Sequence, residues 1–409
     1  MSRMSTLSSV LAAATRPRLL AQAGLAIGIA AVVVTVGAQT PPDWVQRSRT
    51  FEETGLKEPF KGVTAGGTIE PGLFTVRQTG VTTAPVVAAA KAFLETLTPA
   101  ERSQTLFAVD DPEWRKWMNQ HFYVRQGVGF EGLREPQREA AFAMLRASLS
   151  ARGLKLTRDI MHLNQTLGEL NHDDFVQYGE WKYWITIMGT PSATEPWGWQ
   201  LDGHHVIINY FVLRDQVVMT PTFIGSEPVT ATAGKYAGTS VMQDEQNQGL
   251  AFMQSLPPAA RTKATVAAEK TANNNLTEAF KDNVVIPYAG VPASELPPSA
   301  QTALVNLMGL YVGMMDDGHA KVRMTDVKAH LAHTYFAWVG GTSPDAVFYY
   351  RIHSPVVLIE FDHQTPIGIR LPDVSRGPTR QHIHAVVRTP NGNDYGKDLL
   401  RQHLLAHPH

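Results

Sequence analysis

The order of apolar and polar positions divides the chain into helical and strand-forming blocks. Apolar residues recur at helical spacing between about residues 85 and 170, and Thr98 to Glu101 form a capping box with proline at the first helical position. From Trp181 onward, aromatic and β-branched residues dominate, as is typical of strands. In this first block we predict strands over residues 181–188, 197–212 and 217–219.

Helical patterns return in the middle of the chain and are followed by a second β-rich block. We predict helices over about 240–256, 259–272, 300–315 and 397–405, and strands over 334–339, 347–352, 356–362 and 383–388. Two strand blocks separated by helices predict an α+β fold, in which N-terminal helices pack on a mixed, largely antiparallel sheet built from both blocks.

The N-terminus has the pattern of a targeting segment. Arginines precede an uncharged run over residues 19–36, and the small residues Gly37 and Ala38 follow. This pattern predicts that residues 1–38 are a signal peptide, or a signal anchor if they are not cleaved. We expect residues 39–84 to be an extended lead-in and residues 85–409 to form a single large domain. The expected location is secreted or periplasmic, with membrane contact only through residues 19–36 if they are uncleaved.

Composition removes several classes of protein. The net charge is −1, and no basic stripe is present, so we expect no nucleic-acid partner. The chain has no cysteine, which excludes thiolate zinc sites and iron–sulfur clusters and restricts any metal to nitrogen and oxygen ligands. No zincin motif, nucleophile elbow, phosphate-binding loop or dinucleotide fingerprint occurs, so we expect no nucleotide cofactor.

Histidines at the ends of predicted strands are the main candidates for chemistry. His382 and His384 are two residues apart, so on a strand their rings point to the same face and could share one metal ion. His204 and His205 are adjacent and would face opposite sides of a strand, so at most one of them can join the other pair. A strand whose polar face meets solvent is the alternative interpretation.

Two acidic residues are candidates for a catalytic role. Glu360 ends an otherwise apolar strand, where a carboxylate must be paired, hydrogen-bonded or bound to metal. It could orient a histidine, act as a general base, or form a salt bridge with Arg351 or Arg388. Asp394 lies in the turn after the His382–His384 strand, and its simplest role is an N-cap.

A cluster of aromatic residues gives a second candidate site. Trp197 and Trp199 belong to a cluster that starts at Trp181, and together with Arg388 they are candidates for substrate binding. Exported proteins often stack sugars on such rings, but packing in the core is the more common role of large aromatic side chains.

The histidine blocks also carry a resemblance to a known family. The segments 189–192, 196–205, 349–352, 359–361 and 382–384, followed by Asp394-Tyr395-Gly396, resemble the family named only as domain of unknown function 3500, over about residues 85–405. The resemblance implies an exported protein. It implies no settled activity and no catalytic roles.

The leading hypothesis is an exported, metal-dependent enzyme, with a hydrolase favoured over an oxidoreductase. His204 or His205 would bind the ion together with His382 and His384, and zinc, iron, manganese and copper all remain open. The alternatives are a non-catalytic envelope or carbohydrate-binding protein that uses the aromatic cluster, and a metal-binding protein without turnover. The expected partner is a small-molecule or saccharide ligand.

Overall fold

The protein was analysed as a computed structural model that describes residues 43–369 and 377–407. The predicted signal segment, residues 1–38, lies outside this range, so that prediction stays a prediction. Among the described helices, none has both the length and the apolar character that a bilayer crossing requires.

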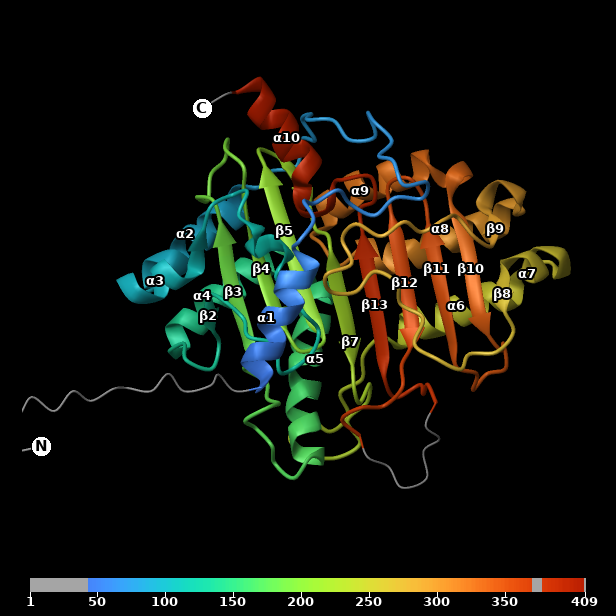
Figure 1. Cartoon of the computed structure of the whole chain (residues 1–409), viewed down its shortest axis with the longest axis horizontal. Coiled ribbons are helices and arrows are strands. Elements are labelled where there is room, and N and C mark those ends of the chain that lie inside the picture. The colour runs from blue at the N-terminus through green and yellow to red at the C-terminus, as the bar shows by residue number, and fades with distance from the viewer. Residues whose placement is uncertain (1–42, 370–376, 408–409) are drawn as a thin grey trace, which may run out of the picture. The chain divides into compact units, whose positions relative to one another are not determined.

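One sheet contains both of the predicted strand blocks (Figure 1). Its strands run in the order β1-β3-β4-β5-β7-β13-β12-β11-β10-β8, so the blocks join where β7 pairs with β13. The first block is β3 (Tyr183–Met188), β4 (Trp197–Gly203), β5 (Val206–Leu213), β6 (Gln216–Val218) and β7 (Thr222–Ser226). The second block is β10 (Tyr335–Gly340), β11 (Phe348–His353), β12 (Leu358–His363) and β13 (Ile383–Arg388).

Most neighbouring strands are antiparallel, and the exceptions lie near the edges of the sheet. The short strands β1 (Leu106–Phe107) and β8 (Thr265–Ala267) pair in parallel with β3 and β10, whereas β2 (Val128–Gly129) and β9 (Val291–Pro292) pair antiparallel with the same two strands. The sheet is therefore mixed and largely antiparallel, and the predicted α+β fold class is confirmed.

Ten α-helices occur in the described part of the chain. They are α1 (Asp43–Gly55), α2 (Ala84–Thr96), α3 (Pro99–Thr105), α4 (Glu135–Ser148), α5 (Ala151–Leu170), α6 (Gln243–Ser255), α7 (Pro258–Ala264), α8 (Pro298–Val312), α9 (Asp317–Ala329) and α10 (Lys397–Ala406). The predicted capping box is present, because the Thr98 side chain accepts from the backbone N–H of Glu101. Two details differ from the prediction: α1 lies in the stretch expected to be extended, and α7 ends at Ala264 because the chain continues as β8.

The two faces of the sheet are covered differently. Alternate residues of β13, including Ile383 and Ala385, belong to a large core that also contains residues of α2, α4, α5, α6 and α8. Val386 points to the other face, where it packs with Phe223, Trp117 and α10. His384 shares this second face with Val386 because strand residues alternate. Besides α10, residues of α1 and of the connecting segments around Asn119 and Glu278 lie at that face, where they line a cavity with the histidines.

The long strand predicted over residues 197–212 is broken by a turn. Gly203 pairs with Val206, so His204 and His205 form a two-residue hairpin loop between β4 and β5. His205 adopts a left-handed conformation with φ of 64°, which is uncommon for a residue other than glycine. The prediction was wrong here because apolar runs flank the turn on both sides. The Asp202-Gly203 dipeptide was a turn signal, but it ends β4 and the loop itself is His204-His205.

Candidate metal centre

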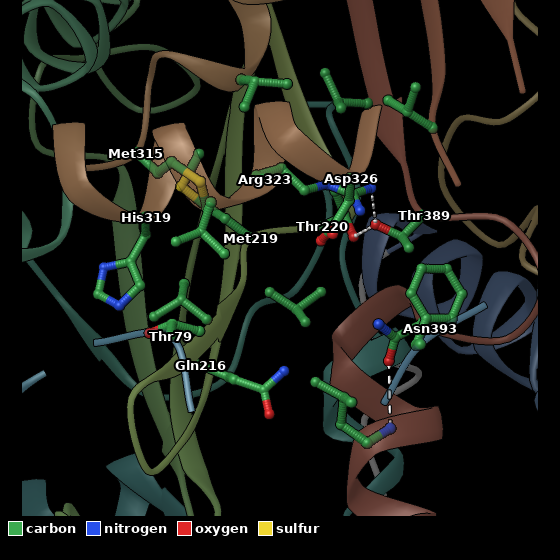
Figure 2. Close-up of a pocket in the computed structure, with 18 of the residues that line it drawn as sticks. Thr79, Gln216, Met219, Thr220, Met315, His319, Arg323, Asp326, Thr389 and Asn393 are labelled. Atoms are coloured by element: carbon green, nitrogen blue, oxygen red, sulfur yellow. Dashed lines mark hydrogen bonds between the residues drawn. The ribbon is translucent and has the colours of Figure 1, made fainter. Parts of the chain in front are cut away.

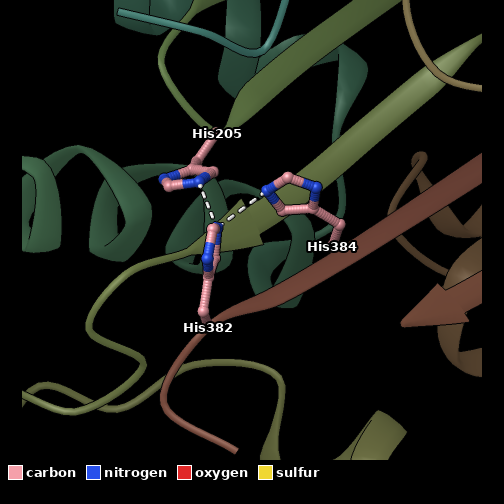
Figure 3. A group of neighbouring side chains, drawn as sticks. All are labelled: His205, His382 and His384. Atoms are coloured by element: carbon pink, nitrogen blue, oxygen red, sulfur yellow. Dashed lines mark hydrogen bonds between the residues drawn. The ribbon is translucent and has the colours of Figure 1, made fainter. Parts of the chain in front are cut away.

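Three histidine rings from two separate segments meet on the second face of the sheet (Figure 3). Nε2 of His382 lies 3.2 Å from Nε2 of His205 and 3.0 Å from Nε2 of His384. One ligand atom from each ring lies within 4.8 Å of the other two. The β4–β5 turn supplies His205, and β13 and the residue just before it supply the other two rings.

A glycine in β7 lets the rings approach one another. Gly225 pairs with His384 across the β7–β13 ladder, and its N–H donates to the carbonyl oxygen of His205 at 2.8 Å. A Cβ at this position would lie 2.5 Å from the carbonyl oxygen of Ile383 and 3.1 and 3.3 Å from ring carbons of His384 and His205. A larger residue would therefore push the histidine segments apart.

Hydrogen bonds on the far side of two rings fix how they point. Nδ1 of His384 lies 2.8 Å from Oε1 of Glu278, and Nδ1 of His382 lies 2.8 Å from the carbonyl oxygen of Thr365 and 3.5 Å from Oε2 of Glu227. The Thr365 carbonyl can only accept, so Nδ1 of His382 carries the proton and its Nε2 presents a lone pair to the centre. An ionised Glu278 imposes the same tautomer on His384. Facing lone pairs repel each other unless a cation lies between them.

Burial keeps the cluster neutral. It lowers the pKa of His205 and His384 well below the usual value, and neighbouring histidines lower these pKa values further. Burial also lowers the pKa of His382, although the Glu227 carboxylate and the Thr365 carbonyl oppose the shift. Neutral imidazole is the form that binds a metal.

The spacing of the nitrogens suits a small metal ion. Metal–nitrogen distances of about 2.0–2.1 Å and tetrahedral angles place two ligand nitrogens about 3.3 Å apart. The observed separations of 3.2 and 3.0 Å are close to this value. This buried histidine group can hold a metal ion.

The fourth candidate ligand, His204, does not join the group. Its ring stacks on that of His205 with centroids 3.9 Å apart, and its Nδ1 lies 2.7 Å from Oδ1 of Asn164. His204 therefore supports a ligand ring instead of binding the ion itself. Only one member of the adjacent pair reaches His382 and His384, as expected, but the expected reason was wrong. The two residues form a loop, and their rings stack instead of facing opposite sides of a strand.

The histidine cluster forms part of the wall of a cavity of about 920 Å³. The two carboxylates next to the rings, Glu227 and Glu278, also line it. Burial raises the pKa of Glu278, while an Asn275 hydrogen bond opposes the shift. An ion held by the three imidazoles would face this cavity with a coordination position open to a ligand.

The proposed catalytic acids lie elsewhere. Glu360 pairs with Val386 instead of His384, and its oxygens accept from the N–H groups of Leu276 and Thr277 and from the Tyr349 hydroxyl at 2.7 Å. The Asp394 carboxylate accepts from the N–H of Thr389 at 2.7 Å and pairs with Arg388 at 3.2 Å. The structure does not bring either acid to the histidines.

The proposed substrate-binding residues are all core residues. Trp197 and Trp199 are 0% exposed; Trp197 donates to the carbonyl oxygen of Ser192, and Trp199 stacks on Tyr210. Arg388 is also fully buried, in an ion-pair network described below. This agrees with the alternative interpretation that the aromatic cluster packs in the core, and it leaves no tryptophan surface at these positions for a sugar.

Sequence reasoning missed the groups that surround the rings. Glu278 and Glu227 lie in connecting segments, 106 and 155 residues before the histidines that they face. Asn164 lies on α5. None is part of a local motif, so only their approach in space reveals their role.

A second cavity, shown in Figure 2, is much smaller, at about 80 Å³. Its polar side chains are engaged with the protein. Arg323 donates to the Val356 carbonyl oxygen and to the Thr389 hydroxyl, and His319 contacts Asp316 and the carbonyl oxygen of Asp215. We therefore place the candidate site at the histidines and not in this cavity.

Fold and site together define an α+β protein with a buried three-histidine centre at the wall of a cavity. The chain belongs to the family described as "Protein of unknown function (DUF3500)", which matches residues 79–397 and confirms the resemblance noted in the sequence. No curated protein and no solved structure matches the chain.

Proposed function

We propose that the protein binds one divalent metal ion through His205, His382 and His384 and hydrolyses a ligand held in the adjoining cavity. The observation that carries this proposal is the convergence of three Nε2 atoms at a cavity wall, with Nδ1 of two rings already engaged by acceptors. Metal-binding histidines in proteins commonly donate their other ring N–H to a carboxylate or carbonyl in this way.

The ligand set favours a catalytic over a structural ion. Structural zinc sites are closed by four protein ligands, whereas catalytic sites keep three and leave one position open. Here three imidazoles contribute, and the described residues include no further histidine or carboxylate that completes the group. The open position faces a cavity whose volume lies within the range usual for small-molecule sites.

The same ligand set favours hydrolysis over oxidation. Non-haem iron oxygenases typically use two histidines and one carboxylate, whereas this centre offers three neutral imidazoles. Neutral ligands would leave the charge of the ion undiminished, and such an ion would supply a Lewis acid for a substrate oxygen or for water.

Two carboxylates of the chain have roles in this proposal. Glu227 holds His382 in place and is itself fixed by the N–H groups of Ile367, Gly368 and Ile369. Glu278 orients His384 through one oxygen. Burial raises the pKa of Glu278 toward the range in which a carboxyl can both accept and return a proton, so it is our candidate for proton transfer in the cavity.

Metal analysis of protein purified without a histidine tag tests the centre. We expect about one equivalent of metal in the wild type and its loss in His384→Ala, because two nitrogens hold an ion much more weakly than three. His353→Phe is the matched control: it removes another buried imidazole, whose nitrogens have no partner among the described residues. Metal-free wild-type protein, or equal metal content in a folded His384→Ala variant, would contradict the proposal.

A substrate screen separates an enzyme from a carrier. Chromogenic esters, amides, phosphate esters and glycosides would be assayed with metal-loaded protein, with chelator-treated protein and with His384→Ala. We expect turnover of at least one class that disappears on chelation and returns with metal. Stoichiometric metal without any turnover would favour the alternative of a metal-binding protein.

A further inference from the structure

The charges around the large cavity disfavour an anionic ligand. Glu227 and Glu278 place two carboxylates beside the histidines. Among the cations that line the cavity, Arg125 pairs with Asp202 at 3.0 Å and also donates to backbone carbonyls, and Lys182 pairs with Glu131 at 2.7 Å. Arg47, the remaining cation of the lining, lies over the Phe122 ring at 4.1 Å. In the metal-free protein, a phosphate, sulfate or carboxylate at the histidines would therefore meet two carboxylates.

Two buried carboxamides in the same cavity lack protein partners. Asn119 is only 6% exposed, and its side chain has no hydrogen bond to any described residue. Its backbone carbonyl accepts from the N–H of His205 at 3.3 Å, which places Asn119 next to the centre. Gln364 is 3% exposed; its Nε2 donates to Asp362, but its Oε1 has no partner in the described structure.

Such groups point to a ligand that can both donate and accept hydrogen bonds. Both side chains line the cavity, where water can reach them, and a ligand hydroxyl would replace that water. A carboxamide offers both donors and acceptors, and a hydroxyl group can satisfy either. Because the carboxylates beside the histidines disfavour an anion in the metal-free protein, the ligand that fits best there is uncharged and rich in hydroxyls.

Aromatic rings at the cavity provide surfaces for the apolar faces of such a ligand. Trp44 on α1 lines the cavity and is 47% exposed, and Tyr178 and Trp184 line it as well. Rings of this type combine a large apolar area with a polar edge, which suits sugar rings. These residues differ from Trp197 and Trp199, which are buried in the core.

A neighbouring cavity gives room for a ligand longer than one sugar ring. This cavity has a volume of about 640 Å³, and Asn119, Gln120 and Glu278 line both cavities. An extended molecule bound at Asn119 could therefore continue from one cavity into the other past Glu278. A single small molecule would use only one of them.

We infer that the large cavity binds an uncharged oligosaccharide, whose hydroxyls are recognised by Asn119 and Gln364 next to the histidine centre. As the substrate class of the hydrolase, this inference rests on the proposed function. As a binding property, it can be tested without metal.

Calorimetric titration of the full chain with cello-, xylo-, malto- and chito-hexaose tests the inference, in metal-loaded and chelator-treated protein. We expect at least one hexaose to bind with a Kd below about 1 mM. In Asn119→Ala, binding should weaken about tenfold, the equivalent of one hydrogen bond to a buried partner. Trp44→Ala provides a second variant on an exposed side chain that should weaken the same interaction without affecting folding.

Gln254→Ala is the matched control, because it removes a carboxamide that bonds to the Thr342 carbonyl outside the cavity. It should bind like the wild type. Binding of none of the four hexaoses, unchanged binding in both cavity variants, or a preference for a polygalacturonate or peptide probe would overturn the inference. If the protein binds metal but none of the hexaoses, only this inference is wrong. If it binds a hexaose but never holds metal, only the proposed function is wrong.

Discussion

The two ends of β13 carry polar clusters on the same face of the sheet, and they differ in how their groups are paired. At one end, His382 and His384 point their Nε2 atoms at each other and at His205, beside a cavity. At the other end, Arg388 pairs with Asp282 at 2.7 Å and with Asp394 at 3.2 Å, and it also donates to the Thr277 carbonyl oxygen.

Side chains around Arg388 complete the second cluster. The Tyr395 hydroxyl donates to Asp282 and accepts from the Trp117 indole N–H, each at 2.9 Å, and Arg115 pairs with the other oxygen of Asp282. Each of the charged groups there has an opposite charge beside it. Buried polar residues alone therefore do not mark a functional site. The charged groups of the Arg388 cluster are paired within the protein and stabilise the fold, whereas the histidine cluster leaves lone pairs for an ion.

Removing the arginine should have the largest effect. Arg388→Met leaves Asp394 buried without its cation, and such a loss typically costs about 3–5 kcal/mol. Urea unfolding of metal-free protein at neutral pH measures the free energy of unfolding. In the same assay His384→Ala should lose less, because the Glu278 carboxyl that loses its partner is partly exposed. Similar losses in both variants would show that the two clusters do not differ in this way.

The next effect tests what an unpaired buried imidazole costs where no other histidine contacts it. Burial, with a contribution from Arg351, lowers the pKa of His353 to about 3. On acidification the unfolded chain takes up the proton first, near its ordinary pKa of about 6.5, so this histidine costs the wild type about 2 kcal/mol by about pH 5. The stability of His353→Phe relative to wild type should therefore rise by about 2 kcal/mol from about pH 7.5 to about pH 5. A pH-independent difference in the free energy of unfolding would rule this out.

The smallest expected effect separates a residue that orients a metal-binding histidine from a residue that binds the metal itself. Glu278→Ala removes the acceptor at Nδ1 of His384 but leaves all three imidazoles, so metal affinity should fall about tenfold or more, near 1.4 kcal/mol. Competition with a fluorescent chelator measures the affinity. Glu278→Gln keeps an acceptor oxygen and should lie between the wild type and Glu278→Ala. An unchanged metal affinity in Glu278→Ala would show that Glu278 does not support the metal centre.

Much of the fold was accessible from the sequence because it depends on local periodicity. Alternation along residues 383–388 placed His384 and Arg388 on one face, and the structure has them there with Ile383 and Ala385 opposite. The capping box at Thr98 was predicted from local sequence as well. The meeting of two strand blocks in one sheet was predicted because neither block alone makes a domain. The turn at His204 and His205 was missed because flanking apolar residues look alike in one long strand and in two short ones.

By itself, the sequence determined the α+β class and the shared face of His382 and His384. Both follow from the local periodicity of side chains, which is about 3.6 residues in a helix and two residues in a strand. Tertiary structure alone decided that His205 and not His204 completes the group, and that Glu278 and Glu227 support the rings. These contacts join segments more than a hundred residues apart, and their formation depends on the pairing of β7 with β13 and on packing of the loops, which no local pattern encodes.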